Sequence, residues 1–164
     1  MNNDDIALAA DSRFAKAAHS QGSVKLAILL VEDEPDQALL VQDALSEDNR
    51  LTLLPAVQSG EAAIAYLSGE GAFADRVAFP FPFLVLLDLH MPGIGGLGVL
   101  RWLQNHPEVN EKLQVVVLSS DQSSREIELA AELGVKQYWV KSDWMLLRQR
   151  IRDLNMLLSD EDPW

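Results

Sequence analysis

Five polar residues stand directly after short apolar runs, where a chain of alternating strands and helices would place a ligand site. Three are carboxylic acids, one is a hydroxyl and one is an amine: Glu32, Asp33, Asp88, Ser119 and Lys141. In an open α/β sheet, ligands bind beyond the carboxyl ends of the strands, so residues distant in sequence meet at one rim. Each acid alone is more simply explained as a helix cap or a solvated side chain. Only the convergence of the whole set indicates a site.

Three ionised carboxylates in one cleft repel one another and shift each other's pKa. A hard divalent cation with oxygen ligands removes that repulsion, and Mg²⁺ typically binds one or two carboxylates and keeps several waters. The charges of Glu32, Asp33 and Asp88 would be balanced by Mg²⁺ (or Mn²⁺) together with Lys141. Such a neutral site could accept a phosphoryl group. Asp88 would be the nucleophile that forms an aspartyl phosphate, and the metal and Lys141 would offset charge on the transferring oxygens.

Composition narrows the classes of protein that could hold such a site. The 164 residues carry 13 basic and 25 acidic side chains, a formal charge of −12, and no cysteine. The absence of cysteine excludes a disulfide scaffold and any thiolate metal site. The acidic balance disfavours nucleic acid and anionic lipid as direct partners, and the longest apolar run is far shorter than the ~20 residues that span a bilayer. We therefore expect a soluble cytoplasmic domain that binds neither nucleic acid nor membrane.

Short apolar runs alternate with stretches of helical spacing along the chain. Runs rich in Val, Leu and Ile are typical of parallel strands covered on both faces. Apolar residues three and four positions apart indicate helices that lay one stripe against a sheet. Five β-then-α units predict a doubly wound five-stranded parallel sheet, an α/β three-layer (βα)5 sandwich with right-handed crossovers. The predicted strands are Leu26–Val31, Leu51–Val57, Phe83–Leu87, Leu113–Leu118 and Gln137–Val140.

Composition divides the chain into an N-terminal arm, a folded domain and an acidic C-terminal tail, which cover residues 1–25, 26–158 and 159–164. Within the domain, Ser59 is expected to cap the second helix, and Gly134 to follow the end of the fourth. Residues 69–82 interrupt the alternation with three phenylalanines. We interpret them as a loop whose aromatic side chains fold over the sheet edge, in preference to a dedicated binding loop.

Four segments together resemble the receiver domain of two-component response regulators. They occur in that family's order, and the resemblance extends over about residues 26–158: AILLVEDEP at 27–35, LLDLHMPG at 86–93, VVLS at 116–119 and YWVK at 138–141. The resemblance implies a flavodoxin-like fold. It also implies a phosphoacceptor that takes its phosphoryl group from a histidine kinase or a phosphotransfer protein, and not an enzyme with a separate substrate.

The resemblance further implies a role for each matching residue of the site. Asp88 matches the phosphoacceptor, Asp33 the direct metal ligand, and Glu32 the neighbouring acid that acts through water. His90 stands at the position whose backbone carbonyl completes the metal site. Lys141 matches the lysine that pairs with the phosphate.

Two further positions match the family's switch residues. Ser119 matches the hydroxyl that turns toward the phosphoryl group, and Tyr138 the aromatic that changes rotamer on activation. The order of the segments is similar to the single-domain regulators that partner bacterial phytochrome kinases. This similarity predicts signalling to a downstream protein target by direct contact. It also predicts a homodimer formed through Tyr138, Trp139, Trp144 and the terminal segments.

Three residues depart from the family pattern. Ser142 follows Lys141 where the family usually has proline in a cis peptide. A cis bond before a non-proline residue costs roughly 3–4 kcal/mol, so we expect a trans bond and a different placement of Lys141. Gly95 and Gly98 stand where acidic residues are common, and they should loosen the start of the third helix.

Other functions compete with this interpretation. Residues 93–98 satisfy G-x-G-x-x-G, which is typical of dinucleotide sites but weak as an isolated motif. An aspartate-nucleophile phosphatase would have a second acid two residues after the nucleophile, where this chain has His90. The rival of a different class is a receiver-like interaction module that no longer turns over a phosphoryl group. The three departures favour that module, whereas the retained acids, hydroxyl and lysine oppose it.

Overall fold

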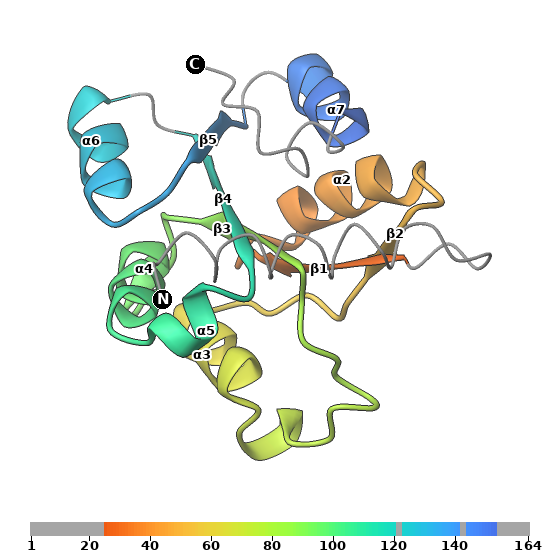
Figure 1. Cartoon of the computed structure of the whole chain (residues 1–164). Coiled ribbons are helices and arrows are strands. Elements are labelled where there is room, and N and C mark those ends of the chain that lie inside the picture. The colour runs from red at the N-terminus through yellow and green to blue at the C-terminus, as the bar shows by residue number, and fades with distance from the viewer. Residues whose placement is uncertain (1–24, 121–122, 142–143, 154–164) are drawn as a thin grey trace, which may run out of the picture.

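The computed structural model describes residues 25–120, 123–141 and 144–153. Its five strands form one parallel sheet in the order β2-β1-β3-β4-β5 (Figure 1). The strands are β1 (Leu26–Val31), β2 (Leu51–Leu53), β3 (Leu84–Asp88), β4 (Gln114–Ser119) and β5 (Gln137–Val140). The helices are α2 (Pro35–Ser46), α3 (Gly60–Ser68), the 3-10 helix η1 (Gly71–Phe73), α4 (Gly95–Gln104), α5 (Pro107–Asn110), α6 (Ser124–Glu132) and α7 (Trp144–Arg152).

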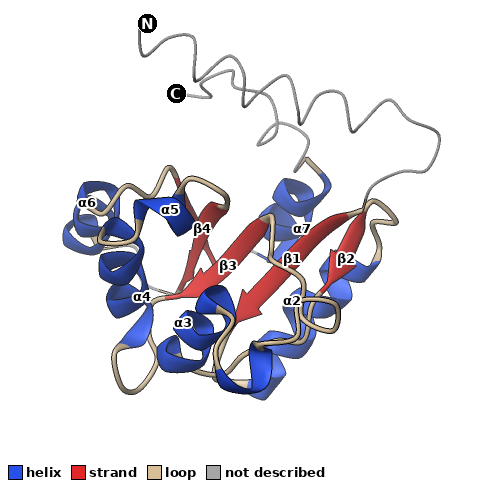
Figure 2. Ribbon diagram, turned by 60° about the horizontal axis from the view of Figure 1, so that its bottom comes forward, coloured by secondary structure: helices blue, strands red, loops and turns tan. Residues whose placement is uncertain are grey.

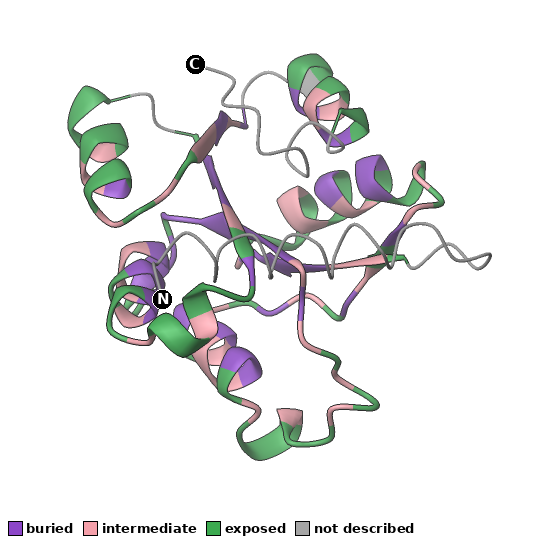
Figure 3. Ribbon diagram, in the orientation of Figure 1, coloured by how far each residue is buried: buried purple, intermediate pink, exposed green. Residues whose placement is uncertain are grey.

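Helices cover both faces of the sheet (Figure 1). This confirms both the doubly wound architecture predicted from the apolar runs and the flavodoxin-like fold implied by the family resemblance. Leu29 and Val31 of β1 pack in the same cluster as buried residues of α3 and α4, whereas Ile28 and Leu30 pack with those of α2 and α7. Every residue of β3 is buried, and Figure 3 shows this burial continuing onto the flanking helices. Figure 2 shows β1, β2 and β3 running in the same direction.

The register of the strands decides which side chains meet beyond their ends. Val31 pairs with Leu87, so the residue after β1 lies beside Asp88, the last residue of β3. Asp88 pairs with Leu118, which places Ser119 next along the rim. Ser119 in turn pairs with Val140, the residue before Lys141. Parallel pairing therefore brings four polar positions to one edge of the sheet.

The second strand is shorter than predicted, ending at Leu53 instead of Val57. Pro55 lacks an amide hydrogen and cannot donate to a ladder, so regular pairing stops before it. The chain stays beside β1 even so, since Val57 donates to the Leu30 carbonyl at 3.0 Å and forms an isolated bridge with Val31.

Two boundary signals are confirmed. The Ser59 hydroxyl accepts a hydrogen bond from the Ala62 amide at 3.1 Å and caps α3. Gly134 follows the end of α6 in the left-handed region, with φ of 87°, which favours glycine.

The aromatic rings of the loop at 69–82 fold inward, onto the core cluster that α3 shares with the sheet. Phe73 and Phe79 lie 4.9 and 6.0 Å from the Tyr66 ring. Arg76 fastens the loop by donating to the carbonyls of Tyr66 and Leu67, both at 2.8 Å. These carbonyls are available to Arg76 because they belong to the last turn of α3, where no later helical turn pairs with them.

The predicted arm and tail lie almost entirely outside the described residues, as does Ser142. Among the helices that the structure describes, none is long and apolar enough to cross a membrane.

Candidate functional site

The acids predicted to converge do so at the carboxyl edge of the sheet. Glu32, Asp33 and Asp88 each offer a carboxylate oxygen, and these atoms all lie within 4.8 Å of one another. Glu32 and Asp88 are 1% and 3% exposed, so two carboxylates are almost wholly removed from water. Burial of two acids this close is costly unless a cation compensates them.

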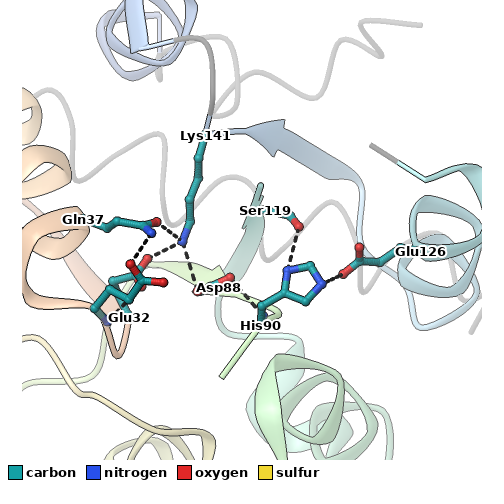
Figure 4. Close-up of polar contacts among 8 residues, drawn as sticks. Glu32, Gln37, Asp88, His90, Ser119, Glu126 and Lys141 are labelled. Carbon is teal, nitrogen blue, oxygen red and sulfur yellow. Dashed lines mark hydrogen bonds and ion pairs between the residues drawn. The ribbon is translucent and has the colours of Figure 1, made fainter. Parts of the chain in front are cut away.

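Lys141 supplies one such cation. Its Nζ lies 2.5 Å from Oε2 of Glu32 and 3.0 Å from Oδ2 of Asp88 (Figure 4). The backbone amide of Lys141 donates to the Ser119 carbonyl at 2.8 Å, which continues the pairing of β5 with β4 by one residue. The displacement of Lys141 expected from Ser142 is therefore wrong: sheet pairing and the two acids hold the lysine at the site.

Lysine alone leaves the cluster two negative charges in excess if all three acids are ionised. Burial raises the pKa of Glu32 above its ordinary value, and the Lys141 ammonium opposes that rise. Neighbouring Asp88 raises the Glu32 pKa further. The site therefore favours any additional positive charge that can enter it.

The residues present fit a hard divalent cation. Within the described part of the chain, Oδ1 of Asp33 is buried with no hydrogen-bond partner. A buried carboxylate oxygen without a partner is stabilised by a bound cation. All the clustered donors are carboxylate oxygens, the ligand type that Mg²⁺ and Mn²⁺ share. Glu32, Asp33 and Asp88 would hold such an ion, which when bound would neutralise charge on a transferring phosphoryl group.

His90 lies on the opposite side of Asp88 from the lysine. Its backbone amide donates to Oδ1 of Asp88 at 3.0 Å. Its ring points away from Glu32 and Asp88, with Nδ1 3.3 Å from the Ser119 hydroxyl and Nε2 3.2 Å from Oε1 of Glu126 (Figure 4). The ring thus joins the fully buried Ser119 to the first turn of α6.

Two of the three residues expected at an interface are described, and they lie in different environments. Tyr138 is half-buried, and its carbonyl accepts from Arg150 at 3.3 Å. Trp139 is only 3% exposed and belongs to the core cluster shared with α2 and α7, because alternate residues of a parallel strand face opposite helical layers. A partner could not touch its ring in this conformation. The side chain of Trp144 lies outside what the structure describes.

Sequence reasoning missed two residues that touch the site. Oε1 of Gln37, in α2, accepts from Lys141 Nζ at 2.8 Å, and Glu126 contacts His90. Neither stands at a strand end or within the four segments that carry the family resemblance, which were the two sources of candidates for the site. An acid or amide in the first turn of a helix is also common without any ligand, so no local signal separated these two from others.

The glycines at 93–98 have a packing role. A Cβ built on Gly96 would meet the Asp88 carbonyl at 2.2 Å and Leu89 Cα at 2.7 Å, so only glycine lets α4 approach the end of β3. Gly95 begins α4 with φ of 61°, a conformation that glycine adopts without strain. The glycines of the motif are therefore explained by close packing of α4 against β3, and they give no support to a dinucleotide site.

Comparison with known proteins identifies the class. Residues 28–152 match the model of the response regulator receiver domain, and the chain belongs to that family. Membership sets aside the dinucleotide-binding and aspartate-phosphatase alternatives.

Particular relatives narrow the resemblance. The chain is 34% identical over 141 residues to Response regulator Rcp1 of Synechocystis sp., covering 84% of this chain and 87% of that protein. It superposes on the phosphorylated cyanobacterial phytochrome response regulator RcpA with a TM-score of 0.71 at 30% identity, over 82% of this chain and 94% of the other. The Mn²⁺-bound form of Rcp1 gives a TM-score of 0.70 at 29% identity, over 83% and 96% of the two chains.

Proposed function

We propose that the protein is a response regulator that accepts a phosphoryl group on Asp88 in a Mg²⁺-dependent reaction and signals by protein–protein contact. One observation carries the proposal: Asp88 lies buried 3.0 Å from Lys141 Nζ and beside Glu32 and Asp33, residues delivered by three different strands. An arrangement serving only stability would gain more from apolar side chains at these positions, since replacing buried ion pairs by apolar residues is often neutral or stabilising.

The transfer itself needs few parts. A carboxylate oxygen of Asp88 attacks the phosphorus of a phosphohistidine donor, the new O–P bond forms as the N–P bond breaks, and the imidazole leaves with the electron pair. Lys141 and the His90 amide both point at Asp88 oxygens, so they orient the nucleophile and compensate charge on the phosphoryl oxygens. Ser119, next along the rim, supplies a hydroxyl for the phosphorylated state.

The partner class follows from the relatives. Several are described as phytochrome response regulators, so a histidine kinase of the bacterial phytochrome class is the proposed phosphoryl donor, directly or through a phosphotransfer protein. The chain matches nearly the whole of Rcp1 and of RcpA, which supports output by contact with a downstream protein. We assign the protein to the cytoplasm, as a phosphoacceptor and not an enzyme with a separate substrate.

A homodimer through β5 and α7 completes the proposal. Met145 on α7 is 86% exposed and Leu146 41%, and half-buried Tyr138 lies on the adjoining strand. Met145→Glu should shift a dimer toward monomer in light scattering at fixed concentration. An unchanged mass would remove this face from the interface.

The function is tested by incubating the protein with Mg²⁺ and acetyl phosphate and measuring intact mass. We expect addition of one phosphoryl group to the wild type, none to Asp88→Asn, and none when the metal is chelated. Metal binding measured in parallel separates the alternatives. If Mg²⁺ binds but no phosphoryl group is added, the protein is a receiver-like interaction module and the proposal fails.

A further inference from the structure

We propose that Gln37 is a positioning residue for Lys141, which holds the ammonium group between Glu32 and Asp88. This inference rests on the proposed phosphoacceptor function and adds a residue to its machinery. Gln37 lies in the first turn of α2, and its Oε1 accepts from Lys141 Nζ at 2.8 Å. Figure 4 shows the amide approaching the ammonium from the side opposite His90.

The contact is one of two hydrogen bonds that the lysine donates. An ammonium group has three N–H donors on a flexible four-carbon stem. Nζ donates to Oε2 of Glu32 at 2.5 Å and to Oε1 of Gln37 at 2.8 Å, and it forms an ion pair with Oδ2 of Asp88 at 3.0 Å. Two directional hydrogen bonds from different elements restrain the position of Nζ beside Asp88.

Gln37 differs in charge and in role from Glu32 and Asp88, the other two residues that contact the Lys141 ammonium. Glu32 and Asp88 are carboxylates assigned to the metal and the phosphoryl group, so their contacts with Lys141 must change during the reaction. The Gln37 amide is neutral, adds no charge to an already acidic cluster, and has no part in the metal site. It is therefore the contact that can stay in place while the other two rearrange.

The amide of Gln37 is itself held in one orientation. Its Nε2 donates to Oε2 of Glu34 at 2.6 Å, which leaves Oε1 facing the lysine. Glu34 is the residue before α2, and Pro35 begins that helix with a fixed φ, so the backbone under this pair is restrained. A restrained amide is an effective fixed point for a flexible lysine.

The contact between Gln37 and Lys141 can compensate for Ser142, which stands where the family usually has proline. Ser142 follows Lys141, so the chain lacks the proline that would restrain the backbone there. The pairing of Lys141 N with Ser119 O fixes the start of the side chain but not its far end. Gln37 restrains that far end from another element of the fold.

The kinetic test compares Gln37→Met with Gln42→Met, the same substitution on the same helix at a residue that is not at the site. Phosphorylation by acetyl phosphate is followed at saturating Mg²⁺, and Mg²⁺ affinity is titrated separately. We expect the rate constant for phosphorylation to fall roughly tenfold in Gln37→Met, because a displaced Lys141 ammonium no longer stabilises charge at the reacting atoms of Asp88. Mg²⁺ affinity and Gln42→Met should match the wild type. Equal rates for both variants would overturn the proposal.

A second readout does not depend on phosphorylation. Side-chain ammonium signals in ¹⁵N-lysine NMR persist only where hydrogen bonds slow proton exchange, and Lys141→Met assigns the Lys141 signal. We expect it in the wild type, its loss in Gln37→Met, and its return when Gln37→Glu is combined with Glu34→Gln, which exchanges donor and acceptor within the pair. A signal that survives in Gln37→Met, or is absent from the wild type, contradicts the proposal.

The two readouts also separate this inference from the proposed function. If the wild type is not phosphorylated on Asp88 at all, the function fails while the NMR comparison still decides whether Gln37 positions Lys141. If the wild type is phosphorylated and Gln37→Met behaves identically in both assays, the function stands and only the role of Gln37 is lost.

Discussion

Asp88 lies between two polar clusters that are built differently. The lysine side consists of Glu32, Gln37 and Lys141; the histidine side consists of His90, Ser119 and Glu126. On the lysine side, contacts to Nζ are 2.5 to 3.0 Å long, and the lysine and glutamate side chains are 6% and 0% exposed. On the histidine side, contacts are 3.2 and 3.3 Å long and the imidazole is 50% exposed.

This difference separates a fixed part of the site from an adjustable one. Short contacts between buried charges are strong and costly to break, because each released group is left without water. Longer contacts through a half-exposed ring are weaker, since water replaces each partner as it leaves. We expect the lysine side to control the reactivity of Asp88. We expect the contacts of the histidine side to break when Asp88 is phosphorylated.

The largest effect should come from removing the cation of the lysine side. Lys141→Met leaves Glu32 and Asp88 buried together without compensation, and we expect loss of about 3 kcal/mol in the free energy of unfolding without Mg²⁺. Phosphorylation should fall on the order of a hundredfold. Urea titration and the acetyl phosphate assay measure these, with exposed Lys136→Met as the control. A variant as stable and as active as Lys136→Met would show that the lysine side is not the fixed part.

Magnesium should stabilise the protein without involving the histidine side. A ligand that binds only the folded state adds about 2.7 kcal/mol at one hundred times its dissociation constant. We expect that increment in the wild type and in Glu126→Gln, and its loss in Asp33→Asn, which removes the carboxylate whose buried Oδ1 lacks a partner among the described residues. Thermal unfolding with and without Mg²⁺ measures it. Retention of the full increment in Asp33→Asn would place the ion elsewhere.

The smallest effect should come from the histidine side. Glu126→Gln keeps the size of the side chain but removes its charge beside His90. We expect beryllofluoride, a phosphoryl mimic, to bind about threefold more tightly, because Ser119 is then freer to leave His90. Tryptophan fluorescence follows the titration, with exposed Glu128→Gln as the control. Weaker binding would mean that the His90–Glu126 contact supports the phosphorylated state and not the resting one.

Residues at strand ends were predictable because a strong general rule applies to them. Parallel strands covered on both faces are visible as apolar runs, and the residue after each run must lie at the ligand edge. Asp88, Ser119 and Lys141 followed from that rule alone. The register adds that Glu32 lies beside Asp88, which apolar runs cannot specify.

Contacts made across the fold were not predictable in the same way. Gln37 and Glu126 reach the site from α2 and α6, and the distance and rotation of these helices relative to the sheet depend on packing. Trp139 is a second such case, because the similarity to phytochrome-partner regulators placed it with Tyr138 at a dimer interface, although a tryptophan at this position is more often core or half-buried. Alternation along β5 puts its ring in the core instead.

The amino-acid order by itself determined the α/β architecture and the acids and lysine of the site, because these depend on periodicity and on strand ends. It also determined the family, because four short segments carry that resemblance. Tertiary structure alone decided how those residues are held: a lysine that donates to Glu32 and Gln37 on one side of Asp88, and a half-exposed histidine linked to α6 on the other. The physical reason is range. Hydrophobic patterns act along the chain, whereas hydrogen bonds of about 3 Å exist only once distant segments have packed.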